Sequence, residues 1–184
     1  MVKVQARCSI AVVAFHRVIP FHLSVPGIVF GEGIVHSNPF DVVVCAGEPG
    51  RIKTSTGFGL TDLASLAALE TADAVIMPGW RDTLDSPPTR LLTALRRAHE
   101  RGAQIVGLCL GTFVLAAAGL LDGRRATTHW EFADRIAACF PTVQIDPDVL
   151  YVDNDNVLTS AGTAGLVASC TARVPFSLSA RSLG

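Results

Sequence analysis

A short stretch around Cys109 limits what this chain can fold into more than any other part of the sequence. The mostly apolar run that follows Gly102, at 103–106, predicts a buried strand. The small apolar residues after the cysteine predict a helix that ends at Gly123. Between them, residues 107–111 read Gly-Leu-Cys-Leu-Gly and place a thiol at a sharp strand-to-helix turn. This is the layout of a nucleophile elbow in which cysteine takes the place of serine.

Such an elbow has a chemical consequence for its thiol. Glycines on both sides of Cys109 indicate a turn too tight for Cβ atoms at those positions. The free N–H groups and the positive dipole end of the following helix lower the pKa of a nearby thiol. We therefore expect thiolate character at Cys109. The alternative is a buried structural cysteine, because free cysteines are among the most buried residues in proteins.

Composition and charge narrow the class of protein. A chain of 184 residues is long enough for one domain with a substantial core, and 49% apolar against 17% charged residues indicates a globular fold. A formal net charge of −1, without any run of Lys or Arg, argues against nucleic-acid binding by this chain itself.

The cysteines and the first residues bear on the compartment. The five cysteines are odd in number and none has CxxC spacing, so we expect reduced thiols and neither a disulfide framework nor a zinc ribbon. The start of the chain lacks the pattern of a signal peptide, and no apolar run reaches ~18 residues. We therefore expect a cytoplasmic protein with no membrane span.

Short apolar runs alternate with helical patterns along the chain. Besides the strand and helix of the elbow, strands are expected at 8–15, 40–46, 74–77, 149–152 and 157–159, and helices at 21–30, 88–101 and 130–140, with a hairpin or turn at 48–59 and a short helix or turn at 61–69. This order predicts a three-layer, doubly wound α/β fold with a mostly parallel sheet. In such sheets ligands bind at the carboxyl ends of strands, where Gly79 and Cys109 are both expected.

The last twenty residues break this pattern. A final helix is expected to cover the sheet, but residues 174–182 are rich in serine, contain Pro175 and have no helical apolar stripe. We therefore divide the chain into a domain at 1–164 and an atypical C-terminal segment at 165–184.

Three motifs carry a resemblance to a known family. One is Cys-Leu-Gly at 109–111 followed by Gly-Leu-Leu-Asp-Gly-Arg-Arg-Ala-Thr-Thr-His-Trp at 119–130, and the others are 20–26 and 159–164. Over residues 8–164 the chain resembles the ThiJ/PfpI group of the class I glutamine-amidotransferase-like superfamily, and within it the N-terminal domain of AraC-type transcription regulators. The resemblance implies a flavodoxin-like fold, a homodimer, and DNA binding only through a helix-turn-helix half that lies outside this sequence. Whether the chain is a shortened regulator or a stand-alone protein stays open.

The resemblance also assigns roles at the site. It makes Cys109 the nucleophile, the backbone N–H groups of Leu110 and Gly79 an oxyanion hole, and His129 a base near the thiol. The alternative for His129 is a structural residue that caps the following helix. A metal site at Cys109, His22 and His129 is a minor alternative, because the spacing fits no metal motif. We expect neither a metal nor a cofactor.

Two residues depart from the enzymes of this superfamily. His22 stands where those enzymes carry Glu or Asp beside the cysteine, and an imidazole differs from a carboxyl in charge and pKa. Leu110 stands where isonitrile-hydrating relatives carry Thr and protease-like relatives carry His. Both departures weaken the enzyme hypothesis. The residues expected to contact a ligand are Trp80, Phe21, Thr112 and Trp130.

Three functions follow as hypotheses. The first is the effector-sensing or dimerising domain of an AraC-type regulator without catalytic turnover. The second is a Cys109-dependent enzyme such as an isonitrile hydratase, an amidase or a glyoxalase-like protein. The third is a redox sensor in which Cys109 oxidises. The missing acid at position 22 favours the first, and the effector, substrate and target DNA stay open.

Overall fold

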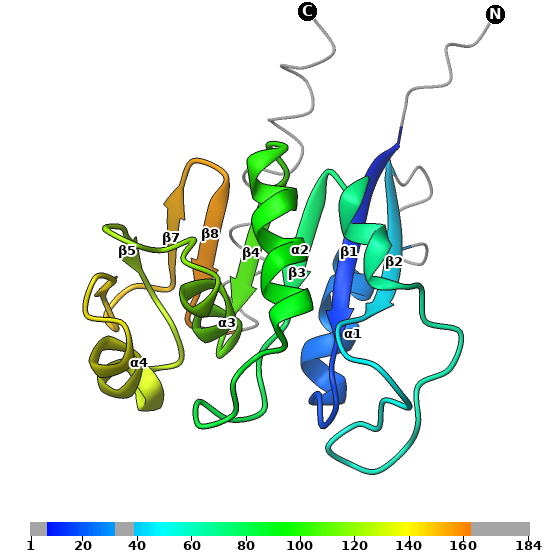
Figure 1. Ribbon diagram of the computed structural model, residues 1–184, viewed down its shortest axis with the longest axis horizontal. Coiled ribbons are helices and arrows are strands. Elements are labelled where there is room, and N and C mark those ends of the chain that lie inside the picture. Colours follow the sequence, from blue (N-terminus) through cyan, green and yellow to red (C-terminus); the bar gives the residue numbers. More distant parts are fainter. Residues whose placement is uncertain (1–6, 32–38, 163–184) are drawn as a thin grey trace, which may run out of the picture.

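A six-stranded sheet organises the molecule, in the order β2-β1-β3-β4-β8-β7 (Figure 1). The computed structural model describes residues 7–31 and 39–162. All neighbouring strands of this sheet are parallel except β7, which pairs antiparallel with β8. The sheet strands are β1 (Cys8–Ala14), β2 (Phe40–Ala46), β3 (Ala74–Met77), β4 (Gln104–Leu108), β7 (Tyr151–Asn154) and β8 (Val157–Ser160).

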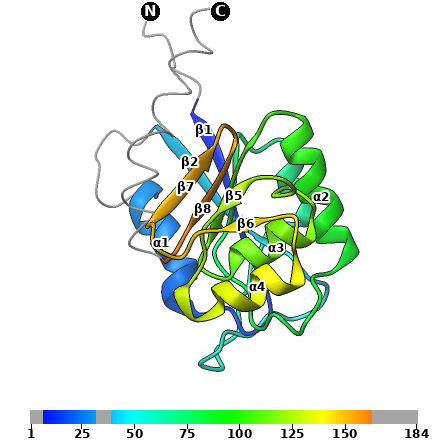
Figure 2. The same cartoon turned by 90° about the vertical axis from the view of Figure 1, so that its left-hand side faces the viewer.

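Helices cover both faces of the sheet. Helix α1 (Pro20–Phe30) lies on one face, and α2 (Thr89–Glu100) and α3 (Gly111–Ala117) lie on the other (Figure 2). The remaining short elements are η1 (Leu66–Glu70), η2 (Trp130–Phe132), α4 (Ala133–Cys139) and a second, two-stranded sheet of β5 (Arg125–Ala126) and β6 (Gln144–Ile145). The predicted three-layer, doubly wound α/β architecture is confirmed.

The two faces bury two separate cores because side chains alternate along each strand. On β1, Ala11 and Val13 pack with Leu91 and Leu95 of α2, whereas Ile10 and Val12 pack with residues of α1. A strand that is buried on both sides must be apolar, which explains the apolar run from Ile10 to Ala14, while the polar Ser9 of β1 is less buried and its hydroxyl donates to Asp73.

Most of the expected elements lie where the sequence placed them, but the helix after Cys109 ends early. It ends at Ala117, not at Gly123, because Gly119 adopts a left-handed φ of 75°. The Gly119 N–H donates to the Ala116 carbonyl and the Leu120 N–H to the Leu115 carbonyl, which is a Schellman motif. Gly119 precedes Gly123 in the chain, and its left-handed backbone already satisfies the last carbonyls of the helix, so the helix ends there.

Two further differences concern the last part of the described chain. The helix expected at 130–140 begins as the 3₁₀ turn η2 before it continues as α4, and the small sheet of β5 and β6 was not expected. The expected segment 165–184 lies outside the described residues. Within the residues that the structure describes, no helix is both long and apolar enough to cross a membrane.

Candidate functional site

The candidate site lies at the carboxyl ends of three adjacent strands, β1, β3 and β4. The chain leaves β1 toward α1, which carries His22, and leaves β3 through Gly79 and β4 through Cys109. Strand order reverses at β1, because β2 lies on one side of it and β3 on the other. Such a switch point opens a crevice beyond the strand ends, which is where ligands of open α/β sheets bind.

Cys109 has the strained backbone of a nucleophile elbow. Its φ is 54°, a left-handed value that is uncommon for residues other than glycine. The following residue, Leu110, is the N-cap of α3. The unusual torsion therefore falls on the cysteine itself, which turns the thiol away from the line of the strand. The sequence had placed the conformational demand on the flanking glycines.

Gly111 is required here for a different reason, the close approach of β3. A Cβ atom on Gly111 would lie 2.2 Å from the Met77 carbonyl oxygen and 3.4 Å from the Gly79 nitrogen. The start of α3 therefore packs directly on the turn that carries Gly79. The predicted oxyanion hole, from the N–H groups of Leu110 and Gly79, needs this contact between the two segments, and its formation stays a prediction.

The Cys109 thiol is buried, and this decides its electrostatics. Burial raises the pKa of the Cys109 thiol above its usual value, and a hydrogen bond from the Leu110 N–H opposes that rise without cancelling it. The elbow alone predicted a lowered pKa. The difference arises because desolvation penalises the thiolate more than the N–H group at the start of the short helix α3 stabilises it.

His22 lies beside the turn after β3. Its Nδ1 atom is 3.5 Å from the position that a Cβ on Gly79 would take, so the ring packs against that turn. The side chain is half-buried, and its burial, with a smaller repulsion from the nearby His129, lowers the pKa of His22 below its usual value. The His22 imidazole is therefore neutral at pH 7. The electrostatic effect of His129 also shows that the two imidazoles share this region.

His129 has a structural role that the sequence analysis gave as the alternative to catalysis. It is the N-cap of η2, and its Nδ1 atom accepts a hydrogen bond from the Glu131 N–H at 3.3 Å. Its ring stacks on Trp130, with centroids 5.7 Å apart. Capping occupies one ring nitrogen. A role for the other nitrogen as a base stays a prediction.

The four residues expected to contact a ligand divide into two pairs. Trp80 is 4% exposed and its indole N–H donates to the Asp85 carbonyl at 2.7 Å, while Thr112 is fully buried and its hydroxyl donates to the Thr127 carbonyl at 2.8 Å. These two side chains are buried and hydrogen-bonded within the protein, and their contact with a ligand stays a prediction. Phe21 and Trp130, by contrast, are 60% and 73% exposed, so both are accessible to a ligand.

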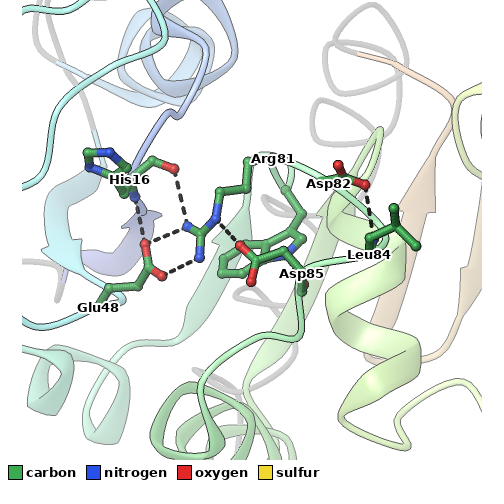
Figure 3. A network of polar contacts seen from close by, with 7 residues as sticks. His16, Glu48, Arg81, Asp82, Leu84 and Asp85 are labelled. Carbon is green, nitrogen blue, oxygen red and sulfur yellow. Dashed lines mark hydrogen bonds and ion pairs between the residues drawn. The ribbon is translucent and has the colours of Figure 1, made fainter.

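A polar network at the same edge of the sheet escaped the sequence analysis. Arg81 binds both carboxylate oxygens of Glu48, at 2.7 and 2.6 Å, and forms an ion pair with Asp85 (Figure 3). Glu48 also accepts the His16 N–H at 2.7 Å, and the Arg81 guanidinium lies 4.4 Å from the Trp80 ring centroid. The network thus ties together the segments that follow β1, β2 and β3. Opposite charges just beyond the ends of β2 and β3 were the signal that could have revealed it.

Buried threonines form the second feature that was missed. Thr112, Thr127, Thr128 and Thr159 are all fully buried, and each makes a hydrogen bond between the elbow, the segment before His129 and β8. The adjacent threonines before His129 belong to the motif at 119–130, but the motif by itself does not indicate their hydrogen bonds. Within the described part of the chain, no three His, Cys, Asp or Glu side chains are grouped to hold a metal ion, so the metal alternative finds no support there.

Comparison with known proteins shows which family has a sequence similar to this chain. The family model described as DJ-1/PfpI matches residues 8–173. The HTH-type transcriptional regulator CdhR of Pseudomonas aeruginosa is 28% identical over 131 residues, which are 71% of this chain and 39% of the regulator. An isonitrile hydratase of Pseudomonas putida is 32% identical over 120 residues, which are 62% of this chain and 50% of the hydratase. The matched stretch spans half or less of each of these two relatives.

The solved structures show the same fold. An AraC family transcriptional regulator from Pseudomonas putida superposes with a TM-score of 0.75 over 93% of this chain and 95% of that chain. The sequences are 20% identical, so this likeness concerns the fold alone.

Proposed function

The chain belongs to the DJ-1/PfpI family, and from this premise we propose that it is the ligand-sensing and dimerising domain of an AraC-type transcriptional regulator. The observation that carries the proposal is the burial of Cys109, which is only 7% exposed. The elbow is formed, with Cys109 at a φ of 54°, yet burial raises the pKa of its thiol. A protonated thiol is a weak nucleophile at neutral pH, which favours binding over catalysis at this position.

The two imidazoles support the same proposal. By the family resemblance His22 stands in the position of the acid of related enzymes, and its lowered pKa keeps it neutral at pH 7. A neutral imidazole stabilises a thiolate less than a positive charge does. The match to the regulator CdhR adds support, as do the exposed rings of Phe21 and Trp130, which offer apolar surface to a ligand or a partner. The proposal includes a homodimer, a cytoplasmic location and DNA binding through a separate domain.

A hydrolytic function is the second candidate, because an isonitrile hydratase is 32% identical to part of the chain. The two candidates make opposite predictions for turnover. The purified chain is incubated with isonitriles, primary amides and 2-oxoaldehydes, with Cys109→Ser as the matched control. The sensing proposal predicts no turnover above that control. Turnover that depends on Cys109 would establish the enzyme candidate instead.

The positive test of sensing uses association and binding. Analytical ultracentrifugation of the chain is expected to show a dimer at micromolar concentration. A metabolite panel screened by thermal shift is expected to contain a compound that raises the melting temperature of the wild-type chain but not of a Trp130→Ala, Phe21→Ala double variant. These rings are exposed, so their removal leaves the core intact. A monomer that responds to no compound would contradict the proposal.

The enzyme alternative has a further test at position 22. His22→Glu restores the carboxyl group that related enzymes carry. The sensing proposal predicts that this variant stays inert against the same substrates. Turnover gained by His22→Glu and lost again in the His22→Glu, Cys109→Ser double variant would identify a former enzyme.

A further inference from the structure

We propose that Thr128 is a positioning residue for the Cys109 thiol. Its buried hydroxyl donates to the Cys109 carbonyl oxygen at 2.9 Å, and Thr128 is directly followed by His129. One side chain therefore links the strained backbone of the thiol to the segment that carries the nearby imidazole. The inference rests on the proposed site around Cys109, but it concerns the reactivity of the thiol and needs no ligand.

The backbone of Cys109 is held from two sides. Its N–H donates to the Ser160 carbonyl at 2.8 Å, which ties it to the end of β8. Its carbonyl accepts the Thr128 hydroxyl at 2.9 Å and, at a longer 3.3 Å, the Thr112 N–H of the following turn. A left-handed φ at a residue other than glycine persists only where the surroundings impose it. Of these two hydrogen bonds to the Cys109 carbonyl, the one from the Thr128 hydroxyl is the shorter.

Thr128 is itself held in place by the residue before it. The Thr127 N–H donates to the Thr159 hydroxyl at 3.0 Å, and the Thr127 carbonyl accepts the Thr112 hydroxyl at 2.8 Å. The Thr127 hydroxyl donates to the Val149 carbonyl at 3.1 Å. The two backbone bonds of Thr127, to Thr112 and Thr159, thus hold the segment next to the elbow, whereas its hydroxyl bond to Val149 lies away from it.

The consequence for the thiol follows from its one favourable hydrogen bond. The Leu110 N–H bonds to the thiol of the preceding residue, Cys109. The geometry of this bond is set by the backbone torsions of the elbow, so the bond depends on the turn being kept. When the Thr128 hydroxyl is removed, the carbonyl of Cys109 keeps only the longer bond, and the turn relaxes. The thiolate then loses part of the N–H stabilisation that opposes burial.

The test compares Thr128→Val with a matched variant at the neighbouring position. The rate constant for iodoacetamide alkylation of Cys109 is measured across pH by peptide mass spectrometry, together with unfolding in urea. Loss of one hydrogen bond predicts that Thr128→Val alkylates about fivefold more slowly at pH 8 and with a pH midpoint above that of the wild type. Thr128→Ser, which keeps the hydroxyl, is expected to restore the wild-type profile.

Thr127→Val is the control because Thr127 is equally buried and its hydroxyl also bonds to a carbonyl, but that of Val149 and not of the elbow. It is expected to lower stability while leaving the pH midpoint of Cys109 unchanged. An unchanged midpoint in Thr128→Val, or an equal shift in Thr127→Val, would overturn the proposal. Should the valine variant fail to fold, Thr128→Ala removes the same hydroxyl without adding bulk, and its profile decides. A chain that binds no ligand would refute the sensing function, but the role of Thr128 would still be decided by the pH profile of Cys109 alkylation.

Discussion

Arg81 and Glu48 form a bidentate ion pair across the carboxyl edge of the sheet, although 33 positions separate them in the chain. Their side chains are only 16% and 12% exposed, so the pair is largely shielded from water. Glu48 follows β2 and Arg81 follows β3, and β1 lies between these two strands in the sheet. The N–H of His16, just after β1, also donates to Glu48. The pair therefore holds in place the loops that surround the candidate site.

Arg81→Met tests the contribution of this ion pair to stability. The substitution leaves the Glu48 carboxylate with a single donor, the His16 N–H, in a shielded position. Removing one partner of such a pair is expected to lower the free energy of unfolding by about 2–4 kcal/mol. The matched control is Asp41→Asn in the exposed Arg7–Asp41 pair, expected to cost less than about 0.5 kcal/mol. Equal losses in urea denaturation would contradict the structure.

The pH dependence of stability follows from the same carboxylate. Burial raises the pKa of Glu48, but hydrogen bonds from Arg81 and the His16 N–H outweigh it, so its pKa in the folded state lies below its usual value. A lowered pKa stabilises the fold above the unfolded value of about 4.3, and this stabilisation is lost as the pH falls through the folded pKa. The difference in unfolding free energy between wild type and Glu48→Gln is expected to be constant from pH 6 to 7 and to shrink below about pH 4. A difference that does not change with pH would show that Glu48 is not held as a carboxylate.

Alkylation of Cys109 reports directly on its protonation. Because burial raises the pKa of the Cys109 thiol, its alkylation by iodoacetamide is expected to be slower at pH 7 than that of a free cysteine peptide and to rise at higher pH than for that peptide. The exposed Cys139 serves as an internal marker of reagent quality, and Cys109→Ser identifies the labelled peptide. A midpoint below that of the free peptide would instead indicate a held thiolate and would revive the catalytic and redox hypotheses.

Gly111→Ala tests the contact between the elbow and β3. The new Cβ would lie 2.2 Å from the backbone oxygen of Met77, which cannot move without displacing the strand. We expect a loss of about 2–3 kcal/mol in unfolding free energy. Gly27→Ala in α1 is the matched control, because nothing lies within 4 Å of its new Cβ and alanine favours a helix. It is expected to stabilise the protein by about 0.5–1 kcal/mol, and a loss there would contradict the packing described for α1.

The sequence was sufficient for the architecture because the relevant signals are local. Strand β3 is buried on both faces and is an uninterrupted apolar run, and the edge strand β2 is apolar apart from Asp41, so the bounds expected for 74–77 and 40–46 coincide with these strands. The turn at Cys109 was predicted for the same reason, since a strand, a glycine-flanked residue and a helix adjoin in the chain. The family resemblance, which the DJ-1/PfpI match confirms, rested on the same contiguous motifs.

The tertiary structure decided which polar groups form hydrogen bonds with one another and in which direction the pKa of the Cys109 thiol shifts. Thr112 and Trp80 are predicted to contact a ligand, and the structure adds that each donates a hydrogen bond to a carbonyl that folding brings to it. The expected lowering of the Cys109 pKa depended on a local dipole, whereas burial by segments distant in sequence raises that pKa. Periodicity along a chain reports which faces are apolar, and it carries no information on which donor meets which acceptor. Hydrogen bonding and desolvation depend on distances between distant residues, and those distances exist only once the sheet has formed.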